Sequence, residues 1–147
     1  HWDGIREDGT FWSADMNSFN HYAYGSIGDW LYRVVAGINT DESRPGYKHI
    51  VIRPQPGEGL EWAEASIKTM YGAVRSAWRK EEGGGLALEV SVPPNTTADV
   101  VLPCAAPDAA EESGKPLADA EGVHGVEATP EGVRVAVGSG EFRFRVR

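Results

Sequence analysis

The residues best suited to ligand chemistry lie within the first two dozen positions. Aromatic residues are mixed there with carboxylates, amides and imidazoles: Trp2, Phe11, Trp12, Phe19, Tyr22 and Tyr24 stand among His1, Asp3, Asp8, Asp15, Asn17, Asn20 and His21. Aromatic faces stack on the C–H faces of sugar rings, and the polar groups supply directional partners for hydroxyls. Composition leaves two interpretations open. The segment is either a sugar-binding loop or a loop whose aromatics pack and whose polar groups cap turns.

The rest of the chain offers few groups that could do chemistry. Cys104 is the only cysteine, so it forms no internal disulfide, and with four dispersed histidines it cannot build a zinc site. His49 and His124 lie on predicted strands without ligand partners. The Gly83–Gly85 run lacks the strand-then-helix context of a phosphate-binding loop. We therefore expect no metal site and no cofactor.

One amphipathic helix follows the aromatic segment. Its apolar residues recur at helical spacing along one stripe, which consists of Ile27, Trp30, Leu31, Val34, Val35 and Ile38. Ser26 with Asp29 fits a helix start, and Gly37 fits a helix stop. The pattern predicts a helix from about Ser26 to Ala36 or Ile38. Such a stripe needs a large apolar partner, either the following domain or helices upstream. We expect part of it to be exposed in this chain alone.

After Arg44-Pro45-Gly46 the pattern becomes that of a β-protein. Apolar residues alternate with polar ones, most clearly over 86–92, 133–137 and 142–146. Further strands are predicted over 49–53, 61–69, 73–79, 98–102 and 123–129. The segment 105–122 is predicted to be a loose surface excursion with at most a short strand at 116–118. Seven or eight short antiparallel strands with Gly and Pro turns indicate a mainly β chain, an antiparallel β-sandwich preceded by a loop and one helix.

Composition excludes several classes of partner. The chain has 22 acidic and 14 basic residues, a net charge of −8, which argues against nucleic acids and acidic membrane surfaces. It contains no run of about 18 apolar residues that could cross a membrane. The chain opens on His1-Trp2 without an initiator Met, whereas natural termini are usually small and polar. We therefore expect a fragment of a longer protein.

Four stretches resemble the C-terminal end of bacterial α-L-rhamnosidases, inverting glycoside hydrolases with an (α/α)6 catalytic barrel. They are HWDGI (1–5), MNSFNHYAYGSIGDWLYRVVAGI (16–38), PGYKHIVIRPQPGEGLEWAEASIKTMYGAVRSAW (45–78) and LEVSVPPNTTADVVLP (88–103). The similarity covers His1 to about Pro103, and NSFNHYAYGS-x-GDWLY and VPPNTTA are its most specific motifs. The resemblance implies that residues 1–42 are the incomplete C-terminal tail of the catalytic domain and that 43–147 are a C-terminal β-sandwich domain. Residues 25–38 would be the last barrel helix.

The resemblance also implies where the catalytic groups lie. The family's catalytic base is a Glu in a Trp-Glu-x-Trp motif, and His1-Trp2 matches the last two positions, so the Glu would immediately precede His1. The general acid would lie far upstream. An inverting glycosidase needs both carboxyl groups, roughly 6.5–9.5 Å apart, and this chain carries neither. His21 carries over as a substrate-binding residue, and Asn20 and Trp2 are weaker candidates.

The predicted function is thus that of the C-terminal part of an enzyme that removes terminal α-L-rhamnose from rhamnose-containing glycosides. Its partner would be the upstream barrel of the same protein, and the fragment alone would be inactive. The alternative is a non-catalytic sandwich that either binds carbohydrate or supports another domain. Its few candidate platforms are Trp62, Tyr71 and Trp78, and Trp78 shares the face of Val74.

Overall fold

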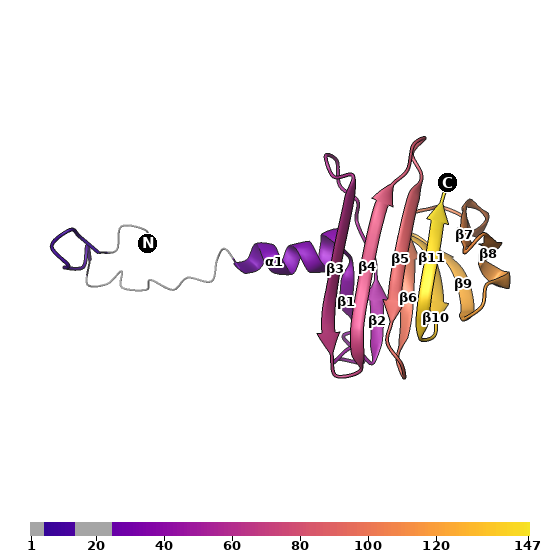
Figure 1. The fold of residues 1–147 in the computed structure, drawn as a ribbon, viewed down its shortest axis with the longest axis horizontal. Helices are drawn as coiled ribbons and strands as arrows, with labels where there is room; N and C mark the ends of the chain where they lie inside the picture. Colours follow the sequence, from indigo (N-terminus) through magenta and orange to yellow (C-terminus); the bar gives the residue numbers. More distant parts are fainter. Residues whose placement is uncertain (1–4, 14–24) are drawn as a thin grey trace.

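The computed structural model describes residues 5–13 and 25–147, and its main body is a sandwich of two β-sheets (Figure 1). The five-stranded sheet has the order β1-β2-β6-β10-β9. Its strands are β1 (Ile38–Thr40), β2 (His49–Ile52), β6 (Thr97–Leu102), β10 (Gly132–Val137) and β9 (Val123–Thr129). The six-stranded sheet has the order β3-β4-β5-β11-β7-β8. Its strands are β3 (Trp62–Thr69), β4 (Gly72–Lys80), β5 (Leu86–Val92), β11 (Gly140–Val146), β7 (Ala110–Glu112) and β8 (Lys115–Pro116).

The predicted β-sandwich is confirmed, and each of the eight predicted strands is present to within two residues of its expected bounds. The strand count is higher than expected because three short strands, β1, β7 and β8, join the sheets. Neighbouring strands are antiparallel except for one pair in the described chain, β2 and β6, which run parallel with His49 opposite Thr97. The connection between β2 and β6 passes through the other sheet, which explains this one parallel pairing.

The prediction of a loose excursion over 105–122 is wrong. The segment forms two short 3₁₀ turns, η3 (Pro107–Ala109) and η4 (Leu117–Asp119), together with β7 and β8. The short strand expected over 116–118 is not formed as such, because Leu117 is the first residue of the 3₁₀ turn η4. Ala110, Leu117 and Ala120 are buried, and β7 pairs with β11. These three buried apolar residues and the pairing of β7 with β11 together hold the segment against the sandwich.

The core lies between the two sheets and follows the sequence alternation. On β4, Val74 and Trp78 point inward, and on β11, Phe142 and Phe144 do so. The two phenylalanine rings are stacked with centroids 6.0 Å apart. Burying each such side chain is worth roughly 1.5–3 kcal/mol, so the alternating apolar residues are the main source of the sandwich's stability.

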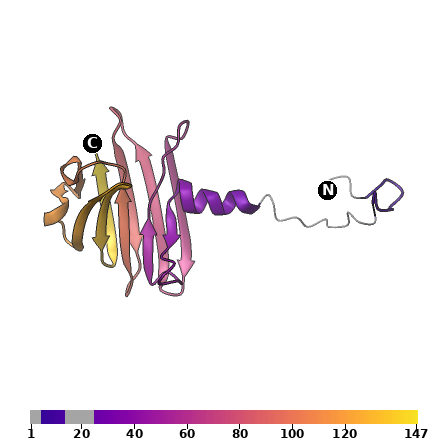
Figure 2. The same ribbon diagram turned by 180° about the vertical axis from the view of Figure 1, so that it is seen from behind.

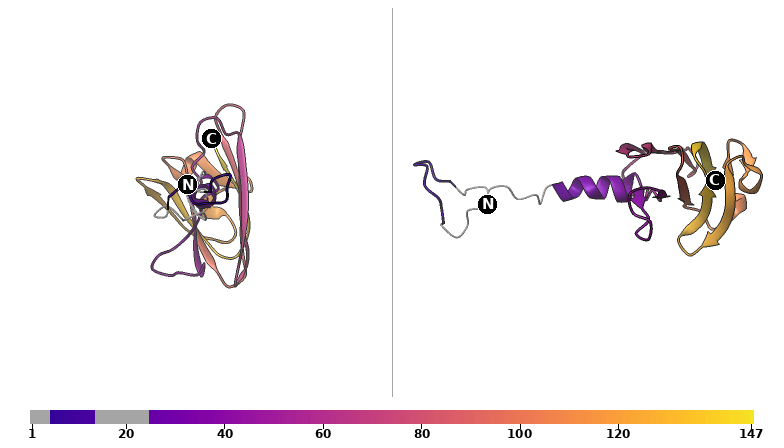
Figure 3. Two further views of the ribbon diagram at one scale, coloured as in Figure 1. Left: turned by 90° about the vertical axis from the view of Figure 1, so that its left-hand side faces the viewer. Right: turned by 90° about the horizontal axis from the view of Figure 1, so that it is seen from below.

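The helix begins at Ser26, as predicted, and projects from one edge of the sandwich (Figures 1 and 2). It consists of α1 (Ser26–Trp30) and the π-helical turn η2 (Leu31–Val35), which follows without a break. Its end is set by Gly37, which has φ +82° and whose absent Cβ would lie 2.2 Å from the backbone nitrogen of Pro54. Only glycine fits there. Ile38 consequently belongs to β1, not to the helix, where the apolar stripe had placed it. Figure 3 shows the helix meeting the sandwich at one end of the sandwich.

Candidate functional site

The three substrate-binding candidates, Trp2, Asn20 and His21, lie outside the described residues, so their assignment stays a prediction. The one part of the aromatic segment that is described, residues 5–13, is a tight turn closed by a bridge between Ile5 and Phe11. Asp8 Oδ1 accepts hydrogen bonds from the backbone nitrogen and hydroxyl of Thr10, at 2.9 and 2.6 Å. These bonds lower the pKa of Asp8. For Asp8, the role of capping a turn is therefore the observed one.

The apolar stripe of the helix divides into a buried end and an exposed end. Val35 and Ile38 are only 5% and 2% exposed, because they pack into the sandwich core. Ile27, Trp30 and Leu31 are 56%, 46% and 47% exposed. The expectation that part of the stripe is exposed is confirmed for the described residues. The sandwich is the partner for one end of the helix only.

Two buried side chains of β4 hold the C-terminal end of the helix. Trp78 Nε1 donates to the carbonyl oxygen of Val35 at 2.7 Å, and Ser76 Oγ donates to that of Ala36 at 2.6 Å. The last carbonyls of a helix have no partner within the helix, so buried donors are needed to satisfy them. Gln55 and Arg53 add backbone bonds to the carbonyls of Val34 and Gly37, at 3.0 and 2.8 Å. We call the contact of Ser76 and Trp78 with the helix end the helix joint.

Sequence reasoning missed the helix joint. It grouped Trp78 with Trp62 and Tyr71 as possible sugar platforms, but Trp78 is 2% exposed and belongs to the core. Tyr71 is half-buried, with the Lys48 ammonium 5.1 Å from its ring centroid. The face that Trp78 shares with Val74, already noted from the sequence, indicates this inward position, but it does not indicate the hydrogen bond to the helix end. Trp62 alone of the three remains an exposed platform, 57% exposed.

Hollows lie beside the helix where it reaches the sandwich. One of about 410 Å³ lies between Trp30, Arg33 and the outward side chain of Val51 on β2. Another of about 510 Å³ lies between Trp30, Val34 and the outward Val101 on β6. Both therefore connect the exposed stripe with the outward face of the five-stranded sheet.

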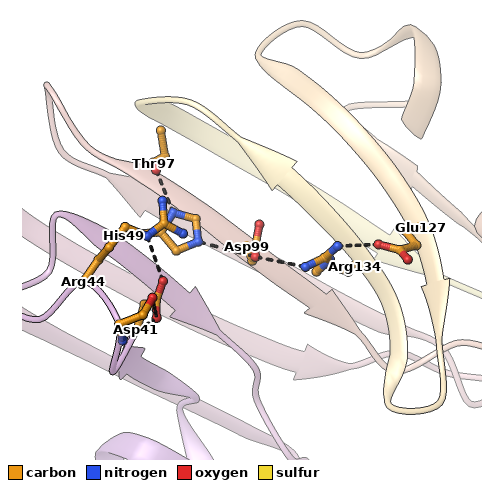
Figure 4. A network of polar contacts seen from close by, with 8 residues as sticks. Asp41, Arg44, His49, Thr97, Asp99, Glu127 and Arg134 are labelled. Atoms are coloured by element: carbon orange, nitrogen blue, oxygen red, sulfur yellow. Dashed lines mark hydrogen bonds and ion pairs between the residues drawn. The ribbon is translucent and has the colours of Figure 1, made fainter.

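A polar network crosses that same face (Figure 4). His49 is 7% exposed, and its Nδ1 lies 2.7 Å from the hydroxyl of Thr97, which stands opposite it on the parallel strand. His49 Nε2 lies 3.4 Å from Asp99 Oδ2 but forms no hydrogen bond within the described residues. Arg134 pairs with Asp99 and with Glu127, and these acidic neighbours raise its pKa, Glu127 contributing most. The network ties β2, β6, β10 and β9 together, which is a structural role.

The turn between β1 and β2 extends the network. Asp41 Oδ1 accepts hydrogen bonds from the hydroxyl and backbone nitrogen of Ser43, at 2.7 and 2.9 Å, and Arg44 Nε lies 2.9 Å from Asp41 Oδ2. The Ser43 hydroxyl is the largest cause that lowers the pKa of Asp41 to about 2. Cys104 shows the opposite shift, because burial raises the pKa of its thiol. Asp41 is thus ionised at neutral pH, and its hydrogen bonds stabilise the turn.

The described residues contain no group of three or more His, Cys, Asp or Glu side chains that could hold a metal ion. Within the same residues, every helix is too short or too polar to cross a membrane. What the described chain offers is a joint, an exposed apolar stripe and surface hollows. The exposed apolar stripe is a surface on which further protein could pack.

Known proteins resemble this chain in both sequence and fold. An α-L-rhamnosidase of Streptomyces avermitilis is 43% identical over 146 residues, which are 99% of this chain and 13% of that protein. Its crystal structure with L-rhamnose superimposes with a TM-score of 0.76 at 42% identity, over 99% of this chain and 13% of the solved chain. The α-L-rhamnosidase structure from Dictyoglumus thermophilum gives a TM-score of 0.74 at 31% identity, covering 90% of this chain and 14% of that one. The chain thus spans about one-eighth of the relatives it matches.

The two-sheet sandwich with a preceding helix is therefore the fold of the C-terminal part of these glycosidases. The family model described as bacterial alpha-L-rhamnosidase C-terminal domain matches residues 37–116, and the chain belongs to this family. The match begins at Gly37, where the helix ends and β1 follows. The resemblance predicted from the sequence motifs is confirmed.

Proposed function

We propose that this chain works as the C-terminal part of a glycoside hydrolase that removes terminal α-L-rhamnose from rhamnosides. The observation that carries the proposal is the 43% identity to an α-L-rhamnosidase along 99% of this chain. Because the chain spans 13% of that relative, the remaining parts of the enzyme must come from another region of the protein.

In this proposal residues 1–42 are the tail of the catalytic domain and 43–147 are the sandwich. β1 (Ile38–Thr40) is the strand by which the tail joins the five-stranded sheet, since it pairs with β2. The exposed residues Ile27, Trp30 and Leu31 form the helix surface that contacts the catalytic domain. The helix joint then fixes the direction in which that surface points, because buried side chains of the core bind the carbonyls of Val35 and Ala36 at the helix end.

The chemistry is assigned to residues beyond this chain. An inverting mechanism uses one carboxylic acid to protonate the leaving oxygen and one carboxylate to activate water. We assign the base to a Glu that immediately precedes His1, and the acid to the upstream catalytic domain. His21 is assigned to the sugar pocket, where a neutral imidazole can hydrogen-bond a rhamnose hydroxyl and orient the base. Asn20 and Trp2 are the neighbouring candidates.

The proposal is tested with the full-length protein that carries this chain. An aryl α-L-rhamnoside is hydrolysed in an NMR tube, and the anomeric proton of the first rhamnose released is followed before mutarotation. The expected product is β-L-rhamnose, because inversion changes the configuration at the reacting carbon. Initial release of α-L-rhamnose would refute the inverting mechanism, and absence of hydrolysis would refute the assigned activity.

A further inference from the structure

A hollow of about 290 Å³ lies on the outward face of the six-stranded sheet, over β3, β4 and β5. These strands lie side by side in Figure 1, with β3 at the sheet edge. This volume is just below the range of about 300–1,000 Å³ that is typical of small-molecule sites. Neither the helix joint nor the proposed catalytic contacts use this face.

Trp62 forms one wall of the hollow and is held in place. It begins β3, is 57% exposed and stands opposite Arg79 on β4. The Arg79 guanidinium lies over the indole, 5.9 Å from the ring centroid, which is within the range of a cation–π contact. This contact orients the ring while more than half of the residue stays accessible, so Trp62 is available as a platform.

The floor of the hollow consists of small side chains. Ala77 on β4 and Ala87 on β5 both point outward and both line it. Larger side chains flank them in the sheet, since Ala77 stands opposite Glu64 and Ala87 stands opposite Arg79. Two methyl groups among long side chains produce a depression beside the indole.

The opposite wall is a fixed set of hydrogen-bonding groups. Arg75 Nε donates to Glu64 Oε1 at 2.8 Å, and its Nη1 donates to Glu89 Oε2 at 2.9 Å. These bonds leave Arg75 Nη2 and the second oxygen of each carboxylate without a hydrogen bond from the described chain. Glu64 has a lowered pKa, chiefly because of the Arg75 bond, and it stays ionised at neutral pH. Donor and acceptors therefore stand side by side before any ligand arrives.

These features fit a sugar better than a protein partner. A pyranose has an apolar C–H face for stacking and adjacent hydroxyls that both donate and accept hydrogen bonds. Protein interfaces need about 800 Å² per partner and a core depleted of charge. Among the lining residues that point outward, the hollow instead offers one indole and two methyl groups beside charged residues. The hollows that continue the helix surface involve the outward side of the other sheet, through Val51 and Val101.

We propose that the Trp62 hollow is a surface binding site for a neutral pyranose unit of a glycan. The ring stacks on Trp62 above Ala77 and Ala87, and its hydroxyls bond Arg75 and the two carboxylates. This site goes beyond the proposed function, since it does not require the chain to belong to an active rhamnosidase. It would hold a glycan without cleaving it.

The test is an NMR titration of the ¹⁵N-labelled chain with three probes: methyl α-L-rhamnoside, methyl β-D-glucoside and methyl β-D-galactoside. At least one probe is expected to shift the Trp62 indole signal and the amides of β3 to β5 saturably. Trp62→Ala is expected to weaken that binding at least about tenfold, because it removes the platform. Ala77→Leu is expected to do the same by filling the hollow while Trp62 remains.

Met70→Ala is the matched control. Met70 is 83% exposed near the other end of the β3–β4 hairpin and does not line the hollow, so its variant should bind like the parent chain. Absence of saturable shifts with all three probes would overturn the proposal. Equal binding by the parent and by Trp62→Ala would also overturn it, and so would equal losses in Trp62→Ala and Met70→Ala.

Discussion

Replacing Trp78 with Phe should destabilise the sandwich strongly, because it removes the main donor of the helix joint. Trp78 Nε1 donates to the carbonyl of Val35 at 2.7 Å, and both groups are buried. A buried carbonyl left without its partner costs about 1–3 kcal/mol. The smaller ring also leaves unfilled space in the core, which adds roughly 1–2 kcal/mol. The expected loss is therefore about 3 kcal/mol in the free energy of unfolding.

The assay is urea unfolding followed by far-ultraviolet circular dichroism, because tryptophan fluorescence changes with the substitution itself. The slope of the free energy against urea concentration should stay constant while the midpoint falls. Trp62→Phe is the control, and since Trp62 is 57% exposed, its effect should stay within about 0.5 kcal/mol. A Trp78→Phe protein as stable as the Trp62→Phe protein would refute the role of the joint.

Three further predictions concern other parts of the chain. In the full-length protein, His21→Ala should lower kcat/KM at least tenfold, which corresponds to about 1.4 kcal/mol, with little change in Tm. His49→Ala is the control and should leave kcat/KM nearly intact, so equal small effects of the two substitutions would refute the assignment of His21 to the sugar pocket. In this chain alone, Leu31→Asp should change the free energy of unfolding by less than about 0.5 kcal/mol, since Leu31 is 47% exposed, whereas Val35→Ala should lower it by about 2 kcal/mol. In the full-length protein Leu31→Asp should lower Tm, and an unchanged Tm would contradict the proposed contact between the helix and the catalytic domain. The folded-state pKa of Asp41, about 2, lies below the unfolded value of about 3.9, so its stabilisation is present above pH about 4 and is lost as the pH falls to 2. Chemical denaturation from pH 7 to 2 should show a gap between the parent and Asp41→Asn that closes over that window, and parallel pH profiles would contradict it.

Local patterns were enough to predict most of the fold. The alternation over 86–92 sets one face of β5 toward the core, and the observed strand has those bounds. The start of the helix at Ser26 was likewise readable from spacing. Ile38 was assigned wrongly because its position fits both the helical stripe and a strand. The close approach of Pro54 to Gly37 decides between them, and that contact joins segments distant in sequence.

The features that depend on contacts between distant segments could not be predicted. β7 forms because β11 offers it a pairing edge, with Glu112 opposite Phe144. The helix joint depends on Trp78 reaching a carbonyl 43 positions earlier in the chain. Sequence alternation showed that Trp78 points inward, but not which buried group its indole nitrogen would meet. The same holds for the Trp62 hollow, whose walls come from three strands.

The most direct test of the account compares hydrolysis of an aryl α-L-rhamnoside by this chain and by the full-length protein that carries it. Both catalytic carboxyl groups are assigned outside the chain, and general acid–base help is worth about 10²- to 10⁴-fold for each group. The chain alone should therefore give no rate above that of buffer, while the full-length protein turns the substrate over. Hydrolysis by the chain alone that persists through a second purification step, with activity eluting together with the protein, would contradict the assignment of the catalytic groups.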